Sequence, residues 1–561
     1  MVVRTHLPRS PIQHVIVLML ENRSYDHMLG FMTHPSVPPL VEGAHPNRVR
    51  PNDPGSTAAG VSPTAPQAFV VDPPHSHLSV MKSLGRRRGM TRGPRYPMDG
   101  FVEACFEKAA CREVVPIIRW WRIEALVAAV SGAIAAFGAA KHRGWLVATG
   151  AAALVVGSAA VAFLSRRPRY RCVGEPAAEE PALQVMDCQP EDQVPVLTTL
   201  AKQYAVATRW FASVPGETWP NRNFAHAATS EGATRIEPGF FDAKTIFHTL
   251  EEAGRDWHIY YDGMPQIMVF DDLWKGDRIA NWFRMTHFWD HVANDTLPSY
   301  SFIEPRHQGD RTNSQHPGNN REPGSDGLFD FERGERLIRD IYAQLLKYPE
   351  VFEKTALLIT YDEHGGLFDH APPAEAVAPS LREASISLTR RFVRWFVTFR
   401  GAKFDFKLYG VRVPAVIVSP WIPAGTVSSD VFDHSSIVAT LRKLFAPGAA
   451  PLTRRDERAN TFDVVLTETA PRRGMQLPDL ATGPRTAGRT AEPPVDAPDG
   501  EDAFSEQLDR LAEEVDRELT RRGVAAPQMD SIRAEQLGWE HVPHDTMLAR
   551  FEGEAERHRG P

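Results

Sequence analysis

The sequence predicts an α/β fold with a mostly parallel sheet and helices on both faces. In the second half of the chain, short apolar runs typical of buried strands alternate with amphipathic helical segments. Polar residues follow two of the apolar runs directly, as they do where parallel strands end at a ligand site. A chain of 561 residues with 42% hydrophobic content also has enough apolar side chains for a sizeable core.

The composition excludes several classes of protein. There are 63 Lys and Arg against 70 Asp and Glu, and the net charge of −7 argues against nucleic acid as the main partner. A mean hydropathy of −0.31 excludes a polytopic transporter. The 21 histidines supply many groups that can ligate a metal or carry a proton near neutral pH.

The first predicted strand covers residues 15–20 and ends in the polar sequence Glu21-Asn22-Arg23. This apolar run is shorter than the core of a signal peptide, and no small-residue cleavage site follows it. We therefore expect a buried strand that delivers polar residues at its carboxyl end, and no N-terminal export signal. Export by a specialised machinery stays open.

An apolar insert follows this first part of the α/β domain. Residues 126–140 and 144–165 carry no charged side chain, and the second run is 22 residues long. About 20 apolar residues span a hydrocarbon core. We therefore favour a membrane hairpin over residues 112–171, with a buried helical hairpin in a soluble domain as the alternative. Arginines are in excess on both flanks, so the positive-inside rule places the main domain in the cytoplasm.

The cysteines all lie in or beside this insert. Their spacing does not match a zinc site, and reduced thiols are expected, with a disulfide staple as the alternative. The four residues are Cys105, Cys111, Cys172 and Cys188.

The rest of the catalytic domain alternates helices and strands. Helices are expected at residues 195–211, 245–254 and 334–348, and strands at residues 257–261, 301–304, 355–361 and 414–419. A linker rich in Pro, Thr, Arg and Gly begins near residue 467. The predicted domains are residues 1–111 and 172–466 for the catalytic part, 112–171 for the insert, 467–502 for the linker and 503–561 for a helical tail.

Acidic residues stand at the ends of two predicted strands. Glu21 and Asn22 follow the first, and Asp362, Glu363 and His364 follow the strand at 355–361. Two acidic groups at one sheet edge repel each other unless a cation lies between them. Oxygen ligands suit Mg²⁺, Ca²⁺ or Mn²⁺, and a set that includes His also suits Zn²⁺ or Fe. Acidic residues after strands are also common helix caps.

A hydroxyl and several histidines are further candidates. Thr218 lies in a Gly- and Pro-flanked turn before a helix expected to begin near Asn221, where a metal-activated nucleophile would meet the helix amino end. An ordinary capping threonine is the alternative. His75, His316 and His434 lie in separate loops that can converge on the same sheet edge, and each alone is more often structural.

These motifs resemble the bacterial phosphoesterase family of phospholipases C and acid phosphatases. The matching stretches run in order over roughly residues 12 to 446: ENRSYDH, DPPHSH, MDGF, GETWPNR, TIFHTLEEAGRDWHIYYDG, SFIEP, LITYDEHGGLFDH, GVRVPAVIVSPWI and FDHSSIV. The resemblance implies an alkaline-phosphatase-like α/β core that hydrolyses phosphate esters.

The resemblance also implies roles for individual residues. Thr218 is the implied nucleophile. His75, His316 and His364 would line the phosphoryl pocket, and His316 or His364 would protonate the departing alcohol. The expected ligands of a divalent metal ion are Glu21, Asn22, Asp362 and Glu363, and the expected substrate-binding residues are Asn221, Arg222 and His434.

The chain departs from the family pattern in two places. The nucleophile turn reads GETWPNR where the family commonly has GPTNPNR, so Glu217 places a negative charge beside Thr218. The apolar insert is also not expected in the family.

The favoured function is a metal-dependent phospholipase C that cleaves phospholipids between glycerol and phosphate. The insert fits a substrate that lives in membranes, and it would make the protein membrane-associated. One alternative is an acid-phosphatase-like phosphomonoesterase acting on soluble substrates. Another is a membrane-permeabilising protein that uses the hairpin.

Overall fold

The computed structural model describes residues 10–67, 69, 72–85, 96–109, 114–116, 170–172, 179–236, 239–319, 323–379, 404–481, 500–524 and 545–560. The chain divides into two compact units. The first contains Met1–Phe106, Glu179–Pro493 and Asp499–Pro561, and the second contains Glu107–Ala178 and Pro494–Pro498.

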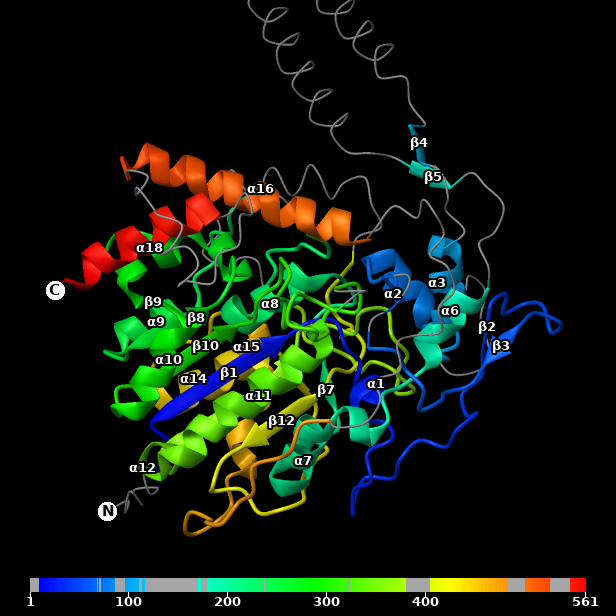
Figure 1. Cartoon of the computed structure of the whole chain (residues 1–561), viewed down its shortest axis with the longest axis horizontal. Coiled ribbons are helices and arrows are strands. Elements are labelled where there is room, and N and C mark those ends of the chain that lie inside the picture. Colours follow the sequence, from blue (N-terminus) through cyan, green and yellow to red (C-terminus); the bar gives the residue numbers. More distant parts are fainter. Residues whose placement is uncertain are drawn as a thin grey trace, which may run out of the picture. The chain divides into compact units, whose positions relative to one another are not determined.

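An eight-stranded sheet forms the centre of the first unit (Figure 1). Its order is β13 (Thr426–Ser428), β6 (Ala205–Ala207), β12 (Ala415–Val418), β11 (Thr355–Tyr361), β1 (His14–Leu20), β10 (Tyr300–Glu304), β8 (Trp257–Tyr261) and β9 (Trp282–Arg284). Only β12 runs antiparallel to its neighbours in this sheet. The mostly parallel α/β architecture predicted from the sequence is therefore confirmed.

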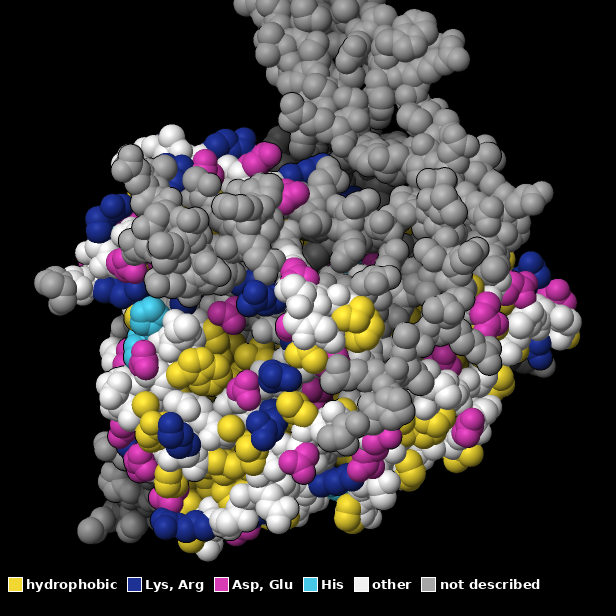
Figure 2. All heavy atoms as spheres, in the orientation of Figure 1, with side chains coloured by type: hydrophobic (Ala, Val, Ile, Leu, Met, Phe, Trp, Pro, Cys, Tyr) yellow, Lys and Arg dark blue, Asp and Glu magenta, His cyan; other side chains and the backbone are white. Residues whose placement is uncertain are grey.

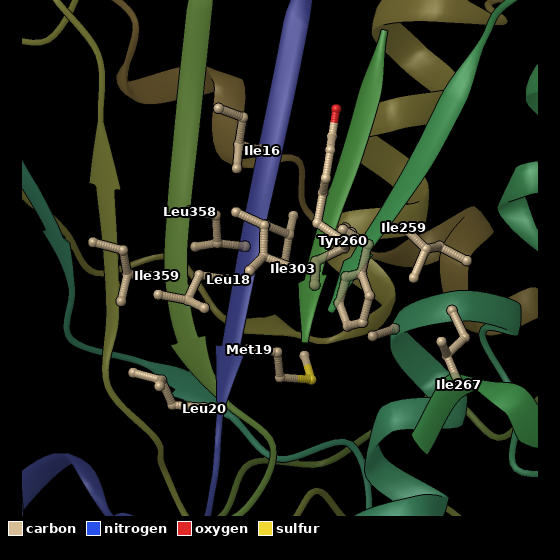
Figure 3. Close-up of a cluster of buried hydrophobic side chains, with 14 of the residues drawn as sticks. Ile16, Leu18, Met19, Leu20, Ile259, Tyr260, Ile267, Ile303, Leu358 and Ile359 are labelled. Atoms are coloured by element: carbon tan, nitrogen blue, oxygen red, sulfur yellow. The ribbon is translucent and has the colours of Figure 1, made fainter. Parts of the chain in front are cut away.

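Strand β1 lies between β11 and β10, and all seven of its residues are buried. Leu18 pairs in register with Ile359 on one side and Ile303 on the other. Such strands need apolar side chains on both faces, because both faces are covered by other elements. Figure 3 shows side chains of β1, β8, β10 and β11 packed together in this core.

Helices cover the sheet in two groups (Figure 1). In one group, α11 (Asp330–Lys347) contacts both α7 (Pro195–Gln203) and α10 (Met285–Ala293). In the other, α14 (Ser435–Phe445) contacts α8 (Thr218–Ala227) and α9 (Ile246–Glu252). This arrangement leaves the carboxyl ends of β1, β10 and β11 side by side, with α8 beginning near them.

Shorter elements complete the described structure. The helices are α1 (Tyr25–Leu29), α2 (His77–Ser83), α3 (Phe101–Ala109), α6 (Glu180–Leu183), α12 (Pro349–Phe352) and α15 (Arg454–Arg458). Two strand pairs are β14 (Phe432–Asp433) with β7 (Trp210–Phe211), and β2 (Asn47–Arg48) with β3 (Ala58–Ala59). The 3₁₀ turns are η1 (Gln184–Met186), η2 (Glu191–Gln193), η3 (Gln266–Val269), η4 (Asp271–Trp274), η5 (Gly276–Asn281) and η6 (Phe462–Val465).

The structure corrects two of the predicted helices. The helix expected over residues 195–211 ends at Gln203, because the chain turns at Tyr204 and continues as β6 and β7. The helix expected to begin near Asn221 begins three residues earlier, so Thr218 is its first residue and Glu217 its N-cap. The strands expected at 257–261 and 355–361 are confirmed with these bounds.

The second unit is described through one short strand pair. Strands β4 (Val114–Pro116) and β5 (Tyr170–Cys172) pair antiparallel, with Pro116 opposite Tyr170. The uncharged runs 126–140 and 144–165 of the predicted hairpin lie outside the described residues. Within the described part of the chain, no helix combines the length and the apolar character needed to cross a membrane. Cys105 and Cys188 are buried thiols, and Cys111 lies outside the described residues.

Two C-terminal helices belong to the first unit. Helix α16 (Gly500–Arg521) contacts η3, and α18 (Asp545–Arg559) contacts α16 and η5. The ring of Phe551 lies 5.3 Å from that of Trp282 and 6.0 Å from that of Trp274. Charged side chains of both signs are interspersed over the outer surface of these helices (Figure 2).

Candidate active site

The site begins where strands β1 and β11 end. Leu20 and Tyr361 pair in register as the last residues of these strands, so Asn22 and Asp362 follow at the same sheet edge. Asn22 has a left-handed backbone with φ 59°, a conformation that Asn tolerates better than most residues. Its backbone N–H donates to Asp362 Oδ1 over 3.0 Å. The turn at Asn22 thus joins the two strand ends.

Two glycines let the loop after β11 approach this turn. Gly365 and Gly366 both have positive φ, 62° and 73°. A Cβ at Gly365 would lie 2.2 Å from the carbonyl oxygen of Asn22, and one at Gly366 would lie 2.8 Å from Pro73 Cβ. Only residues without a Cβ fit here. The close approach places the loop that carries His75 beside the strand ends.

Thr218 enters the site as the first residue of α8. Its hydroxyl donates to Asn22 Oδ1 over 3.3 Å. The preceding turn is held by the Asn221 side chain, which accepts from Val214 N over 3.0 Å and donates to the carbonyls of Val214, Gly216 and Glu217. Unpaired N–H groups at a helix amino end attract anions. The turn therefore presents a hydroxyl and an anion-favouring helix end together.

Glu217, where the sequence departs from the family pattern, forms a hydrogen bond to a residue outside this turn. Its Oε2 accepts the backbone N–H of Ile236 over 2.5 Å. The residue is half-buried.

Arg222 and His434 contact the strand ends from within the protein. Arg222 Nε donates to Asp362 Oδ2 over 3.0 Å, and its NH2 group donates to the carbonyls of Met19 and Leu20. His434 Nε2 lies 2.6 Å from the backbone oxygen of Asp362, while its Nδ1 accepts from Trp210 Nε1. Both side chains hold Asp362 in place. Direct contact of Asn221, Arg222 or His434 with a substrate stays a prediction.

Three histidines lie around Asn22 and Glu363. His75 Nδ1 donates to the carbonyl of Pro73, so its Nε2 accepts from the Asn22 amide at 3.5 Å. The rings of His75 and His316 are 6.0 Å apart. His364 Nδ1 lies 3.1 Å from Glu363 Oε2. Contacts thus connect the predicted ligands, nucleophile and histidines into one cluster.

A comparison with models of protein families identifies the family of this chain. The family model described as Phosphoesterase family matches residues 165–446, about half of the chain. The match contains Thr218, Asp362, Glu363 and His434. This chain belongs to the phosphoesterase family. The resemblance inferred from the motifs is confirmed, and the protein is a hydrolase acting on phosphate esters.

Curated relatives cover most of this phosphoesterase. Non-specific phospholipase C6 of Arabidopsis thaliana is 31% identical over 514 residues, which are 88% of this chain and 79% of the relative. Non-specific phospholipase C3 of the same plant is 30% identical, over 84% of this chain and 77% of the relative. Among solved structures, the phosphonate monoester hydrolase of Agrobacterium radiobacter aligns with 50% of this chain and 74% of that chain, at 14% identity and a TM-score of 0.27.

Burial and charged neighbours shift the pKa values of the acids in the phosphoesterase site. It raises the pKa of Asp362 to about 6 and that of Glu363 to about 8. Burial also acts to raise the pKa of Glu21, but His307 and Arg222 hold this pKa well below its usual range. A nearby cation would favour the ionised form of all three acids.

The site has more buried carboxyl groups than buried cationic side chains. Four carboxyl groups face two cationic side chains: Glu21, Glu304, Asp362 and Glu363 against Arg222 and His307. Although burial lowers the pKa of His307, its two carboxylate neighbours raise this pKa to about 9, so the ring is charged at neutral pH. When all four acids are ionised, their negative charges exceed the positive charges of these two side chains by two.

Two buried polar atoms beside these acids also lack partners. Glu363 Oε1 and His364 Nε2 have no hydrogen bond to any of the described residues. A buried polar atom without a partner is costly. Hard oxygen ligands, surplus negative charge and unpaired atoms together fit a divalent cation.

Two further acids and a histidine form a separate cluster. Among the residues that the structure describes, one set of three His, Cys, Asp or Glu side chains has its ligand atoms within 4.8 Å of one another: Asp26, Asp369 and His370. Arg412 already donates to both carboxylates, over 2.9 and 3.0 Å. Asp26 follows Asn22 and Asp369 follows Glu363 in the chain, so this ion-pair cluster ties together the loops that carry both.

The candidate site residues predicted from the sequence did not include Gln266, Glu304 and His307, which the structure places around Glu21. Gln266 Nε2 donates to Glu21 Oε1, and His307 Nδ1 lies 3.0 Å from Glu21 Oε2. Glu304 contacts His307 and Arg222. The position of Glu304 at the end of a predicted strand was an available signal. Gln266 and His307 have no such signal, because the tertiary fold alone brings them to the site.

Proposed function

We propose that this phosphoesterase is a metal-dependent phospholipase C that cleaves phospholipids between glycerol and phosphate through Thr218. The observation that carries the proposal is the Thr218 hydroxyl at the amino end of α8, 3.3 Å from Asn22 Oδ1. The relatives named non-specific phospholipase C support the substrate class.

Glu21, Asn22, Asp362 and Glu363 would hold the metal ion. Their oxygens are hard ligands of the kind that Mg²⁺, Ca²⁺ and Mn²⁺ prefer. When bound, a divalent cation would lower the pKa of the Thr218 hydroxyl and draw charge from the phosphoryl oxygens. Chelation should therefore abolish turnover, and added divalent metal should restore it.

In the first chemical step, Thr218 Oγ1 forms a bond to phosphorus and diacylglycerol leaves. The N–H groups at the start of α8 face the phosphoryl group and stabilise its negative charge. His316 Nδ1 accepts the N–H of Gly318 over 3.1 Å, so the neutral ring carries its proton on Nε2. This proton goes to the departing alcohol oxygen as its bond to phosphorus breaks, and the proton released by Thr218 Oγ1 returns the ring to its neutral form.

In the second step, water releases the phosphorylated head group from Thr218. Burial lowers the pKa of His364 to about 3, so the ring is neutral at physiological pH. Its Nδ1 proton points to Glu363 Oε2, which leaves the Nε2 lone pair to accept a proton from the attacking water. This proton then goes to the Thr218 oxygen as its bond to phosphorus breaks, so the hydroxyl is restored. The two histidines thus divide the acid and base roles between the two steps.

The test is to replace Thr218 by Ala and by Ser. Thr218→Ala should lower turnover of a chromogenic phosphodiester by at least about 1,000-fold, since the nucleophile is lost. Thr218→Ser keeps a hydroxyl and should retain measurable activity. Thermal unfolding checks that both variants fold. Undiminished activity of folded Thr218→Ala would contradict the nucleophile assignment.

Substrate class is tested separately. A phospholipase C should release diacylglycerol from phosphatidylcholine vesicles faster than it hydrolyses a soluble phosphomonoester of the same concentration. The reverse order of rates would favour the phosphomonoesterase alternative.

A further inference from the structure

Glu304 is a buried acid that the proposed chemistry does not use. It is the last residue of β10, the strand next to β1, and its side chain has no solvent exposure. Both of its carboxylate oxygens are engaged. Oε1 accepts the backbone N–H of Ile267 over 3.0 Å. Oε2 accepts from two cationic side chains, Arg222 NH1 at 3.0 Å and His307 Nε2 at 2.8 Å.

Each of these cations also contacts a second acid of the site. Arg222 extends from Glu304 to Asp362, where Nε donates over 3.0 Å. His307 extends from Glu304 to Glu21, where Nδ1 lies 3.0 Å from Oε2. Arg222 and His307 are 3% and 1% exposed, so neither contact is weakened by solvent. Glu304 therefore contacts both cations that hold the other acids: Arg222, which binds Asp362, and His307, which binds Glu21. We call these two chains of contacts the two arms of Glu304.

We propose that Glu304 is a positioning residue that fixes Glu21 and Asp362, on two different strand ends, through His307 and Arg222. The inference rests on the proposed function, in which these two acids bind the metal. Partners that orient a metal ligand from behind commonly change metal affinity by about 10- to 100-fold when they are removed. Glu304 touches neither substrate nor metal in this scheme.

The test compares metal affinity between matched carboxamide variants. Glu304→Gln keeps the size of the side chain but removes the charge that both arms share. Its affinity for Mn²⁺, measured by titration calorimetry on the whole chain at constant pH, should fall about 10- to 100-fold. Saturating Mn²⁺ should restore most of kcat on a soluble phosphodiester, with KM little changed. Glu335→Gln changes another buried acid, which lies on α11 and accepts the N–H of Val196 in α7. This variant should bind Mn²⁺ as the unmodified protein does.

The outcomes separate the inference from the proposed function. If the unmodified protein binds no divalent metal, the metal-dependent mechanism is overturned and the inference with it. If it binds Mn²⁺ and folded Glu304→Gln binds equally well, only the positioning role is overturned. His307→Gln removes one arm and leaves Glu304 in place, so it should also weaken Mn²⁺ binding; it is the second test if Glu304→Gln does not fold.

Discussion

At the scale of single residues, the site depends on side chains and glycines that permit unusually close contacts. Asn22 uses its backbone N–H for Asp362, its amide oxygen for Thr218 and its amide nitrogen for His75. Gly365 packs directly against the backbone carbonyl of Asn22. Because Asn22 connects the nucleophile to a predicted metal ligand, a shift of its backbone moves both.

Gly365→Ala tests this close contact. The new Cβ would lie 2.2 Å from Asn22 O at φ 62°, so both a clash and an unfavourable backbone oppose it. We expect destabilisation of at least about 2 kcal/mol and a large loss of turnover. Urea unfolding and phosphodiester hydrolysis measure the two effects.

Gly254→Ala is the matched control. Gly254 has φ 67°, and a Cβ there meets no atom within 4 Å. The Gly254→Ala substitution should lower the free energy of unfolding by about 1 kcal/mol, through backbone strain alone, and leave turnover unchanged. Equal effects of the two substitutions would show that the contact with Asn22 has no importance for activity.

The sequence predicts residues of the site when a local pattern places them. Glu21 and Asp362 follow seven-residue strands whose side chains are all buried, so the apolar runs ended where the polar groups began. His307 could not be predicted in this way. It reaches Glu21 through packing between segments that are almost 290 residues apart, and no local pattern encodes such a contact.

At the scale of elements, helix ends are held by buried side chains from elsewhere in the chain. Asn221 holds the turn that starts α8, and Glu335 on α11 accepts the N–H of Val196 in the first turn of α7 over 2.8 Å. The first N–H groups of a helix lack intrahelical partners, so such contacts define where the helix starts. The end of α7 was mispredicted because the apolar pattern continues into β6, and the turn at Tyr204 has no Gly or Pro to mark it.

Glu335→Gln tests the electrostatics of the α7 contact. Burial raises the pKa of Glu335 from 4.5 to about 8. Between these values the unfolded chain has released the proton and the folded chain still holds it, so the free energy of unfolding falls as pH rises. The loss is about 1.4 kcal/mol for each unit of pKa difference, or roughly 5 kcal/mol in all. Below about pH 4.5 the contribution is fully present.

Urea unfolding at pH 5 and pH 8 measures this effect. Glu335→Gln cannot ionise, so its free energy of unfolding should decline less over this interval than that of the unmodified protein. The variant should accordingly be the more stable of the two at pH 8. Equal declines would contradict a buried, protonated Glu335.

At the scale of the whole molecule, the sequence predicts the architecture because its signals accumulate over many elements. Alternating strands and helices indicated the mostly parallel sheet, and nine ordered motifs indicated the family. The packing of α16 and α18 against η3 and η5 was not predictable, since their amphipathic pattern shows a buried face but not its partner. All residues of the candidate site lie in the first unit.

Removal of residues 117–169 tests whether the first unit is catalytically self-sufficient. Pro116 and Tyr170 are paired across β4 and β5, so a short Asn-Gly turn can join them without separating the chain ends. We expect turnover of a soluble phosphodiester to stay within about twofold and Mn²⁺ affinity to be unchanged, because the candidate site is built from residues of the first unit. Hydrolysis of phosphatidylcholine vesicles should fall if the predicted membrane hairpin brings the enzyme to its substrate. A folded deletion variant that has lost activity on the soluble ester would instead make the insert part of the catalytic machinery.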